Sequence, residues 1–217
     1  MKFWRSIGSF FLPQLTWQRE VASKEVFLTF DDGPHPEITP WVIKELEKVN
    51  AKATFFVVGE NAKQYFSLID ELQKSGHRVG NHTFRHTKGW RVSSQMYLDD
   101  IADCEDYLTN NTLFRPPYGR INFGAIPTIK KNYEIVMWDV LTKDYLPRLN
   151  VKRALRRIKK ETKPGSIIVF HDSGKAKKNL EAMLPEYLLF LKEEGYKMAR
   201  PNQVVSKRRC SRYKWLW

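Results

Sequence analysis

The chain has 217 residues, 42% of them hydrophobic and 13% aromatic, which is enough for one domain with a large core. Its net charge of +13 is compatible with an anionic membrane or polymer as a partner, but no helix-turn-helix, zinc-finger or aromatic strand motif supports binding to nucleic acid. Two cysteines exclude a disulfide framework, and no apolar run is long enough to cross a bilayer.

Residues 1–24 are predicted to form an N-terminal extension that packs on the domain. Lys2 and Arg5 precede a hydrophobic run, as in a signal peptide, but the run is short, interrupted by glycine, serine and proline, and lacks a cleavage site. We therefore favour a cytoplasmic or peripherally membrane-associated protein. An apolar stripe would lie on one face of a helix in this segment. Such a stripe favours packing onto the domain over lying on a membrane surface, and it consists of Phe3, Trp4, Ile7, Phe10 and Phe11.

Seven short runs rich in β-branched and aromatic residues predict β-strands. They are residues 26–30, 53–58, 78–81, 112–114, 134–138, 166–170 and 196–199.

Helical patterns lie between these runs. The first is residues 40–49, with Thr39 as N-cap and Pro40 at the first position. The second has a capping box at Asn61 and Gln64 and stops at Gly76. The others are about residues 94–108, 123–131, 151–162 and 180–194, the last with a predicted kink at Pro185 and an end at Gly195.

This alternation predicts a parallel α/β domain over residues 25–203 with right-handed crossovers. A complete eightfold barrel usually takes about 250 residues, so we expect a shortened, distorted (β/α) barrel, TIM-barrel-like, with about seven parallel strands. An open doubly wound sheet is the alternative. Nothing in the sequence indicates an oligomeric state.

Two basic runs carry much of the charge, residues 152–163 and the predicted tail, residues 204–217. The first run fits a solvated helix face, because its apolar residues share the opposite face. The tail leaves open a peripheral contact with an anionic membrane or polymer. Cys104 falls on an apolar stripe with Tyr97, Ile101 and Leu108 and is predicted to pack in the core.

Acids, histidines and an arginine follow five of the predicted strands. In a parallel barrel or sheet these strand ends share one face, where the active site lies. The residues are Asp31 and Asp32, then His82 and His86, then Arg115, then Asp139 and Asp144, and finally His171 and Asp172.

Two imidazoles spaced by four residues, His82 and His86, can reach one metal ion, and one carboxylate would complete a catalytic three-ligand site. An HxxxH pair alone is weak support, since such pairs are more often unrelated surface or capping residues. The adjacent acids Asp31 and Asp32 strengthen the hypothesis. If one binds a divalent cation, the other can stay ionised and take a proton from an activated water molecule. An Asx-turn or a helix cap would explain one aspartate, but hardly two.

Five ordered segments resemble the motifs of the polysaccharide deacetylases, carbohydrate esterase family four, also known as the chitooligosaccharide deacetylase homology domain. They are TFDDGP (29–34), HTFRH (82–86), RPPYG (115–119), DVLTKDY (139–145) and VFHD (169–172). The resemblance covers about residues 25–200. It implies a distorted (β/α) barrel and metal-dependent removal of N-acetyl groups from N-acetylhexosamine glycans such as peptidoglycan or chitin.

By motif position, the resemblance implies that Asp32, His82 and His86 bind the metal ion, usually zinc, although Co²⁺, Ni²⁺ or Mn²⁺ can serve in relatives. Asp31 would be the general base, and Arg115 would keep it ionised and aimed.

The same resemblance implies that the backbone N–H of Tyr118 helps to stabilise the oxyanion and that His171 protonates the departing amine. Asp144 best fits the partner of His171 by motif position, with Asp139 as a competitor.

Three positions depart from the usual motifs, namely Leu141 and Tyr145 in the fourth and Val169 in the fifth. Their counterparts line the acetyl pocket in relatives, so the acyl specificity is less defined than the chemistry. Two alternatives remain: the same chemistry on an O-acetyl sugar or another small amide, and a non-catalytic glycan-binding barrel. We place three further residues with chemical side chains outside the site, His35, His77 and Asp172.

Overall fold

The computed structural model describes residues 12–200. The apolar face predicted at residues 3–11 and the basic tail at residues 204–217 lie outside this part, so both stay predictions. The division of the chain into extension, catalytic domain and tail also stays a prediction. Within the described residues, every helix is too short or too polar to traverse a bilayer.

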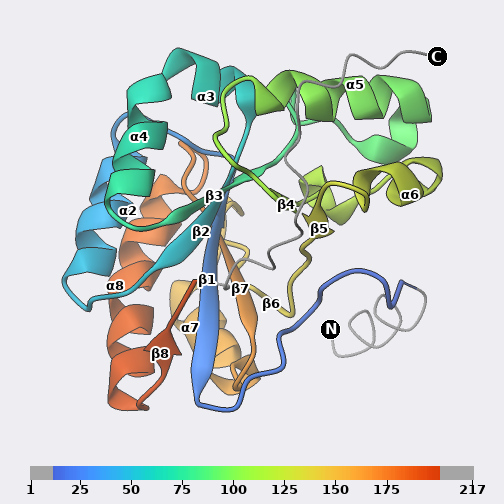
Figure 1. The fold of residues 1–217 in the computed structure, drawn as a ribbon. Helices are drawn as coiled ribbons and strands as arrows, with labels where there is room; N and C mark the ends of the chain where they lie inside the picture. The colour runs from blue at the N-terminus through green and yellow to red at the C-terminus, as the bar shows by residue number, and fades with distance from the viewer. Residues whose placement is uncertain (1–11, 201–217) are drawn as a thin grey trace.

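A curled sheet of parallel strands forms the centre of the molecule (Figure 1). Its main path runs β5-β4-β3-β2-β1-β7-β6, and β8 pairs with the start of β1. The strands are β1 (Glu25–Asp31), β2 (Ala53–Val57), β3 (Arg78–Asn81), β4 (Leu113–Phe114), β5 (Glu134–Ile135), β6 (Val140–Leu141), β7 (Ile167–His171) and β8 (Lys197–Met198).

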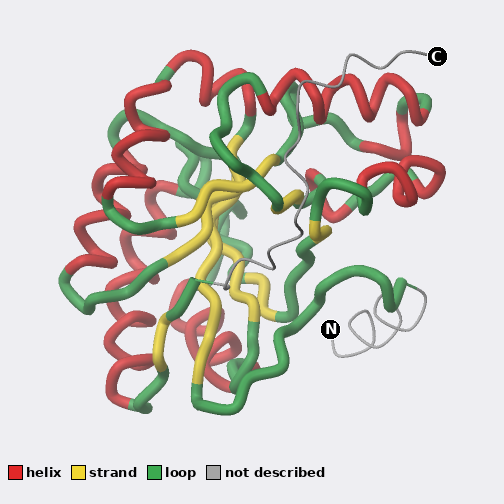
Figure 2. Tube along the Cα trace, in the orientation of Figure 1, coloured by secondary structure: helices red, strands yellow, loops and turns green. Residues whose placement is uncertain are grey.

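Helices cover the outside of this sheet, as the red and yellow segments of Figure 2 show. The α-helices are α2 (Ile38–Glu47), α3 (Gly59–Gln64), α4 (Phe66–Lys74), α5 (Ser94–Glu105), α6 (Ile126–Ile129), α7 (Val151–Glu161) and α8 (Lys177–Glu193). Three 3-10 turns, η1 (Gly89–Arg91), η2 (Pro117–Gly119) and η3 (Phe123–Ala125), lie in the loops after β3 and β4. The predicted shortened α/β barrel is confirmed.

Strand β1 is buried on both faces, which explains its composition. Leu28 and Phe30 point outward into the main core beneath the helices. Phe27 points inward into a smaller apolar cluster, and Thr29 and Asp31 follow it on that inner face because strand side chains alternate. The inner face is thus apolar at the start of β1 and polar at its end.

The barrel is not closed by its own strands, because no pairing joins β5 to β6 among the described residues. Chain segment 16–19 lies in this gap. The N–H of Thr16 donates to Ile135 O at 2.9 Å, and the N–H of Arg19 donates to Gly165 O at 2.9 Å. The described part of the N-terminal extension therefore touches both sides of the opening.

The single strand expected at residues 134–138 is wrong. The structure has β5 and β6 on opposite edges of the sheet, separated by residues 136–139. The carbonyls of Val136 and Met137 accept hydrogen bonds from the Arg115 guanidinium at 3.1 and 2.9 Å. These carbonyls serve a buried cation, and the strand does not continue through them.

Two helix starts also differ from prediction. Helix α2 begins at Ile38 and has no side-chain cap. Thr39 lies inside its first turn, where its hydroxyl accepts a hydrogen bond from the His35 N–H and donates one to the Asp172 carboxylate. The predicted second helix is divided at Tyr65 into α3 and α4. Asn61 does not cap it, since its amide donates to Asp32 O at 2.8 Å.

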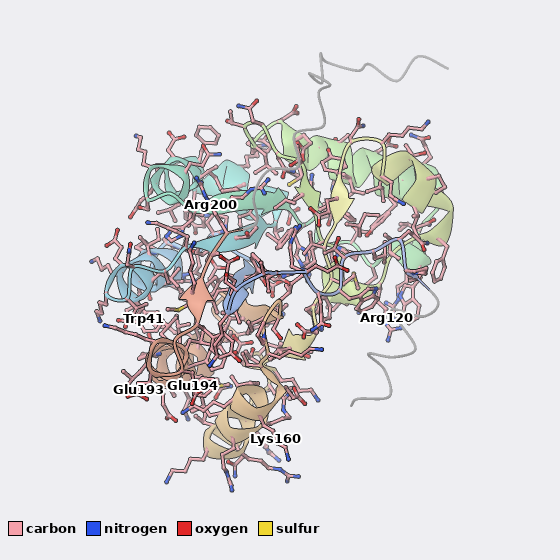
Figure 3. The ribbon with its side chains drawn as sticks, turned by 60° about the horizontal axis from the view of Figure 1, so that its bottom comes forward. Trp41, Arg120, Lys160, Glu193, Glu194 and Arg200 are labelled. Atoms are coloured by element: carbon pink, nitrogen blue, oxygen red, sulfur yellow. The ribbon has the colours of Figure 1, made fainter. Side chains whose placement is uncertain are left out.

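Several other predictions are confirmed. Helix α7 buries Ala154, Leu155 and Ile158 and carries its basic residues on the other side, where Lys160 is labelled in Figure 3. Cys104 is fully buried on α5. Helix α8 contains Pro185 and ends just before Gly195, whose φ of 73° suits a glycine. The helix predicted at residues 123–131 is shorter, made of η3 and α6.

Candidate active site

The predicted functional side chains gather where the parallel strands end. Asp31 closes β1 and His171 closes β7, and these two residues are paired in the register of neighbouring strands. His82 comes directly after β3, and Arg115 directly after β4. Parallel strands bring their carboxyl ends to one face, so residues 140 positions apart in the chain become neighbours.

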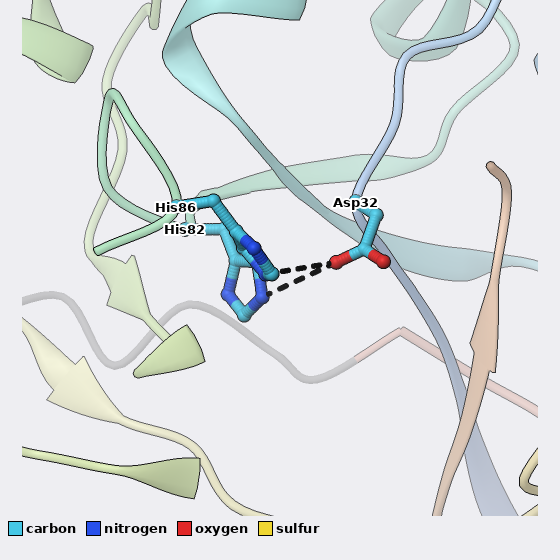
Figure 4. A group of neighbouring side chains, drawn as sticks. All are labelled: Asp32, His82 and His86. Atoms are coloured by element: carbon cyan, nitrogen blue, oxygen red, sulfur yellow. Dashed lines mark ion pairs between the residues drawn. The ribbon is translucent and has the colours of Figure 1, made fainter. Parts of the chain in front are cut away.

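Asp32, His82 and His86 form one group whose ligand atoms all lie within 4.8 Å of one another. Asp32 Oδ1 lies 3.1 Å from His86 Nε2 and 3.7 Å from His82 Nε2. Figure 4 shows both imidazole rings turned toward this carboxylate. A tetrahedral zinc ion with ligand bonds of about 2.0–2.1 Å holds its ligands about 3.3 Å apart, so the spacing fits such an ion.

His82 is held in the orientation that a metal ligand needs. Its Nδ1 lies 2.7 Å from Arg115 O, so this nitrogen donates and Nε2 keeps a free lone pair toward Asp32. Burial lowers the pKa of His82 to about 4, and the charge of Asp31 offsets this only in part. The neutral imidazole required for metal binding is therefore the form present at neutral pH.

Asp32 supplies the carboxylate of the group. Burial alone would raise the pKa of Asp32, but the hydrogen bond with His86 and the charges of His171 and His82 outweigh it and lower the pKa. The residue also has a φ of 76°, and Asn61 holds its carbonyl. The Asp32 carboxylate is thus ionised, and its backbone has a fixed, uncommon conformation.

Asp31 and Arg115 form a buried ion pair inside the barrel. Arg115 Nη1 donates to Asp31 Oδ1 at 2.7 Å and to Thr29 Oγ1 at 2.7 Å. Arg115 is fully buried, and its guanidinium also lies over the ring of Phe56, 4.1 Å from its centroid. Every part of the guanidinium thus has a partner, which fixes the position of the Asp31 carboxylate.

His171 has a carboxylate partner, and that partner is Asp144. His171 Nδ1 lies 2.7 Å from Asp144 Oδ1, and the His171 N–H donates to Asp144 Oδ2 at 2.8 Å. Burial alone would lower the pKa of His171, but the charge of Asp144 and the hydrogen bond with it raise the pKa to about 9. His171 is therefore protonated at neutral pH.

Asp139, the competing candidate, has a different place. Its carboxylate accepts hydrogen bonds from the Ile167 N–H at 2.7 Å, from Ser166 Oγ at 2.9 Å and from Gln18 Nε2 at 2.7 Å. These partners lie at the start of β7, whereas His171 closes the strand. Asp139 ties the N-terminal segment to the sheet.

Tyr118 lies beside the metal-ligand group. Its ring centroid is 4.6 Å from that of His86, and its side chain is 54% exposed. Its φ is 59°, and positive φ values recur at Asp32, Thr83, His86 and Lys143 in the loops around the site. Left-handed backbone at residues other than glycine is uncommon and concentrates at functional sites.

Sequence reasoning missed three asparagines that hold these loops. Asn61 donates to Asp32 O, and Asn179 donates to Asp144 O at 2.7 Å. Asn81 accepts a hydrogen bond from the Thr83 N–H at 2.8 Å. Their amides satisfy backbone groups that turns leave unpaired. The Asn81 contact is local, whereas those of Asn61 and Asn179 join distant segments, which no sequence spacing marks.

The three residues predicted to lie outside the site are accounted for in the structure. His77 lies at the opposite end of β3, where burial lowers its pKa to about 4. His35 is half-buried and accepts a hydrogen bond from the Glu37 N–H. Asp172 braces its loop through Thr39 Oγ1, and burial raises the pKa of Asp172 to about 8.

The family model described as polysaccharide deacetylase matches residues 18–134. A peptidoglycan-N-acetylglucosamine deacetylase of Bacillus cereus is 32% identical over 198 residues, covering 88% of this chain and 92% of that protein. A chitooligosaccharide deacetylase of Azorhizobium caulinodans is 35% identical over 157 residues, covering 68% of this chain and 73% of the relative.

A solved structure agrees with the fold. The Bc1960 peptidoglycan N-acetylglucosamine deacetylase, in complex with 4-naphthalen-1-yl-N-oxidanyl-benzamide, superposes with a TM-score of 0.81 at 30% identity. The match covers 88% of this chain and 93% of that one. The family model, the similarity to these relatives and the shared barrel agree with one another. The chain therefore belongs to the polysaccharide deacetylases, the hydrolases of carbohydrate esterase family four.

Proposed function

We propose that this protein is a metal-dependent N-deacetylase that hydrolyses the N-acetyl group of N-acetylglucosamine residues in a peptidoglycan-type glycan. The observation that carries the proposal is the convergence of three pieces of chemistry at one face of the barrel. These are the ligand group of Asp32, His82 and His86, the Asp31–Arg115 pair and the His171–Asp144 pair.

The donor set of one carboxylate and two imidazoles fits zinc, and three protein ligands are typical of a catalytic ion. A divalent cation held there would act as a Lewis acid on the amide carbonyl and lower the pKa of a water molecule.

The chain's own residues would carry the proton transfers. Asp31, aimed by Arg115, accepts the proton of the attacking water as the new C–O bond forms. The Tyr118 N–H donates a hydrogen bond to the developing oxyanion. His171, held protonated by Asp144, then delivers a proton to the sugar nitrogen as the C–N bond breaks. Acetate and a free amine are the products.

The substrate assignment rests on the relatives. The B. cereus protein acts on peptidoglycan by its name, and the match covers nearly all of it. The A. caulinodans protein is named for chitooligosaccharides, so a neutral N-acetylglucosamine oligomer is the second candidate substrate.

The proposal is tested by measuring acetate released from peptidoglycan fragments and from N-acetylglucosamine oligomers. We expect activity with Zn²⁺, loss after chelation, and recovery when Zn²⁺ is added back. His82→Ala should lower both zinc affinity and acetate release, since it removes a ligand and its fixed orientation. His35→Ala is the matched control, an imidazole outside the site. Acetate release that persists after complete metal removal, or that His82→Ala leaves intact, would contradict the proposal.

A further inference from the structure

Beside the candidate site lies a surface patch of side chains that the hydrolysis itself does not use. It consists of two cations, Lys88 and Arg120, and two exposed aromatic residues, Trp90 and Tyr118. Trp90 is 57% exposed and Tyr118 is 54% exposed, whereas most other aromatic rings within residues 12–200 are buried or half-buried. Exposed aromatic rings next to a catalytic site are typical of binding surfaces.

Two loops build this patch, and backbone hydrogen bonds join them. The Gly89 N–H donates to Arg120 O at 2.9 Å, and Asn122 Nδ2 donates to Gly89 O at 3.1 Å and to Val92 O at 3.0 Å. The loop after β3, which carries the metal-ligating histidines, is thereby tied to the loop after β4. The patch is therefore part of the same framework as the site.

Each cation of the patch is positioned by an aromatic ring. Arg120 Cζ lies 4.1 Å from the centroid of the Trp90 ring, and Lys88 Nζ lies 4.4 Å from that of Tyr118. Within residues 12–200, neither cation is paired with a carboxylate. A guanidinium stacked on a ring keeps its N–H donors free in its own plane, where they can meet a carboxylate.

The patch is continuous with the place where the acetyl group would be cleaved. The Tyr118 ring contacts the His86 ring at 4.6 Å, and Lys88 lies over Tyr118. A sugar next to the one being deacetylated would therefore reach these residues. Positive charge without counter-ions selects a negatively charged group there, and the free face of an indole suits a sugar ring.

We infer that Lys88, Trp90 and Arg120 form a subsite for a carboxylate-bearing sugar adjacent to the reacting N-acetyl sugar. The subsite rests on the proposed function and adds to it, because it favours an acidic glycan over a neutral chitin-type chain. Trp90 stacks on the sugar, and Arg120 and Lys88 bind its carboxylate.

The test uses the 217-residue protein with added Zn²⁺ and two forms of one oligosaccharide. The first alternates N-acetylglucosamine with a lactyl-substituted, carboxylate-bearing sugar; in the second, the same carboxylates are amidated. The wild-type kcat/KM should favour the acid form by about tenfold, since an exposed ion contact contributes up to about fivefold and two are present. This preference should shrink as salt is added, because Arg120 is exposed and Lys88 is only half-buried, so salt screens both charges.

The double variant Lys88→Gln/Arg120→Gln should bring the acid-to-amide ratio close to one, mainly through KM. Trp90→Ala should weaken binding of both forms, and of the acid form more, because the ring stacks on the sugar and also positions Arg120. Lys160→Gln, an exposed cation on α7 far from Arg120 (Figure 3), should keep the wild-type ratio. Melting temperatures check that the variants fold.

Equal kcat/KM for the two forms in the wild type would overturn the subsite, as would an unchanged ratio in the double variant. If no acetate is released from either form, the proposed function fails. The subsite is then decided by the dissociation constants of the two oligosaccharides. Tighter binding of the acid form by the wild type, with this preference lost in the double variant, supports the subsite. Equal affinities of the wild type for the two forms refute it.

Discussion

Asp31 and Arg115 face each other inside the barrel with both side chains almost completely removed from water. The pair is therefore structural as well as chemical. Removing one partner of a buried ion pair leaves an uncompensated charge, which costs about 3–5 kcal/mol.

We predict that Asp31→Asn lowers acetate release about 10²–10⁴-fold, because it removes the proposed general base. It should also lower the free energy of unfolding by about 3–5 kcal/mol, because Arg115 loses its counter-ion. Chemical denaturation and an acetate assay measure the two effects. Glu186→Gln, which breaks the exposed pair with Lys159, is the control and should cost at most about 1 kcal/mol. A fully stable Asp31→Asn protein would contradict this account of the pair.

His171 provides a second test at this scale. Its pKa is raised from 6.5 to about 9, so the protonated form persists until the pH rises through about 9. The stability that this proton contributes is present in full below pH 6.5 and is lost as the pH rises through about 9.

Asp144→Asn should therefore lower the pKa of His171, because it removes the negative charge that opposes burial and leaves one acceptor oxygen for the two N–H groups of His171. NMR titration of the imidazole in the metal-free protein measures the change. Asp139→Asn serves as the control, since its carboxylate binds Gln18, Ser166 and Ile167 and should leave the His171 titration in place. An unshifted titration in Asp144→Asn would mean that another group holds the proton.

At the scale of the elements, the site depends on short loops that follow the strands. Asp32, Thr83, His86, Tyr118 and Lys143 have positive φ values in these loops. Such conformations are maintained only where neighbouring contacts determine them. The asparagine amides supply several of these contacts.

Asn61→Ala should weaken zinc binding about 10- to 100-fold, because its amide holds the carbonyl of Asp32, a proposed ligand. A competition titration with a chromophoric chelator measures the affinity. Gln64→Ala is the matched control, since Gln64 is exposed, and it should bind zinc like the wild type. If both variants lose stability and keep zinc affinity, Asn61 acts as a helix cap after all.

At the scale of the whole molecule, the open barrel depends on a segment outside its own strands. Thr16 bonds to the β5 side of the gap and Arg19 to the start of β7. Arg19 also pairs with Glu134 at 2.7 Å, with both side chains largely buried. The segment takes the place of the missing strand pairing.

Thr16→Pro should lower the free energy of unfolding by about 1–3 kcal/mol, because the Thr16 N–H that bonds to Ile135 O is lost. Thermal and denaturant unfolding measure it. Thr16→Ala keeps this N–H and loses only the side-chain bond to Glu134, so it should retain most of the stability. Equal effects of the two substitutions would show that the backbone pairing carries little weight.

The sequence by itself determined the class of fold and located the residues that meet at the candidate site. Period and spacing located most helices, and β1 is a continuous apolar run because it is buried on both faces. The acids and histidines of the candidate site could be located in the sequence because they directly follow the apolar runs that predict strands. Both signals are local, so one chain without coordinates is enough to show them.

Only the tertiary structure decided which distant residues meet. It showed that Asp144, and not Asp139, is the partner of His171, and that residues 134–141 are divided between two edges of the sheet. It also showed that Asn61, predicted as a helix cap, donates a hydrogen bond to the carbonyl of Asp32. It also placed Arg120 on Trp90 beside the site. These outcomes depend on contacts between segments remote in sequence, where the partner that satisfies a buried charge or carbonyl is set by packing and not by any local pattern.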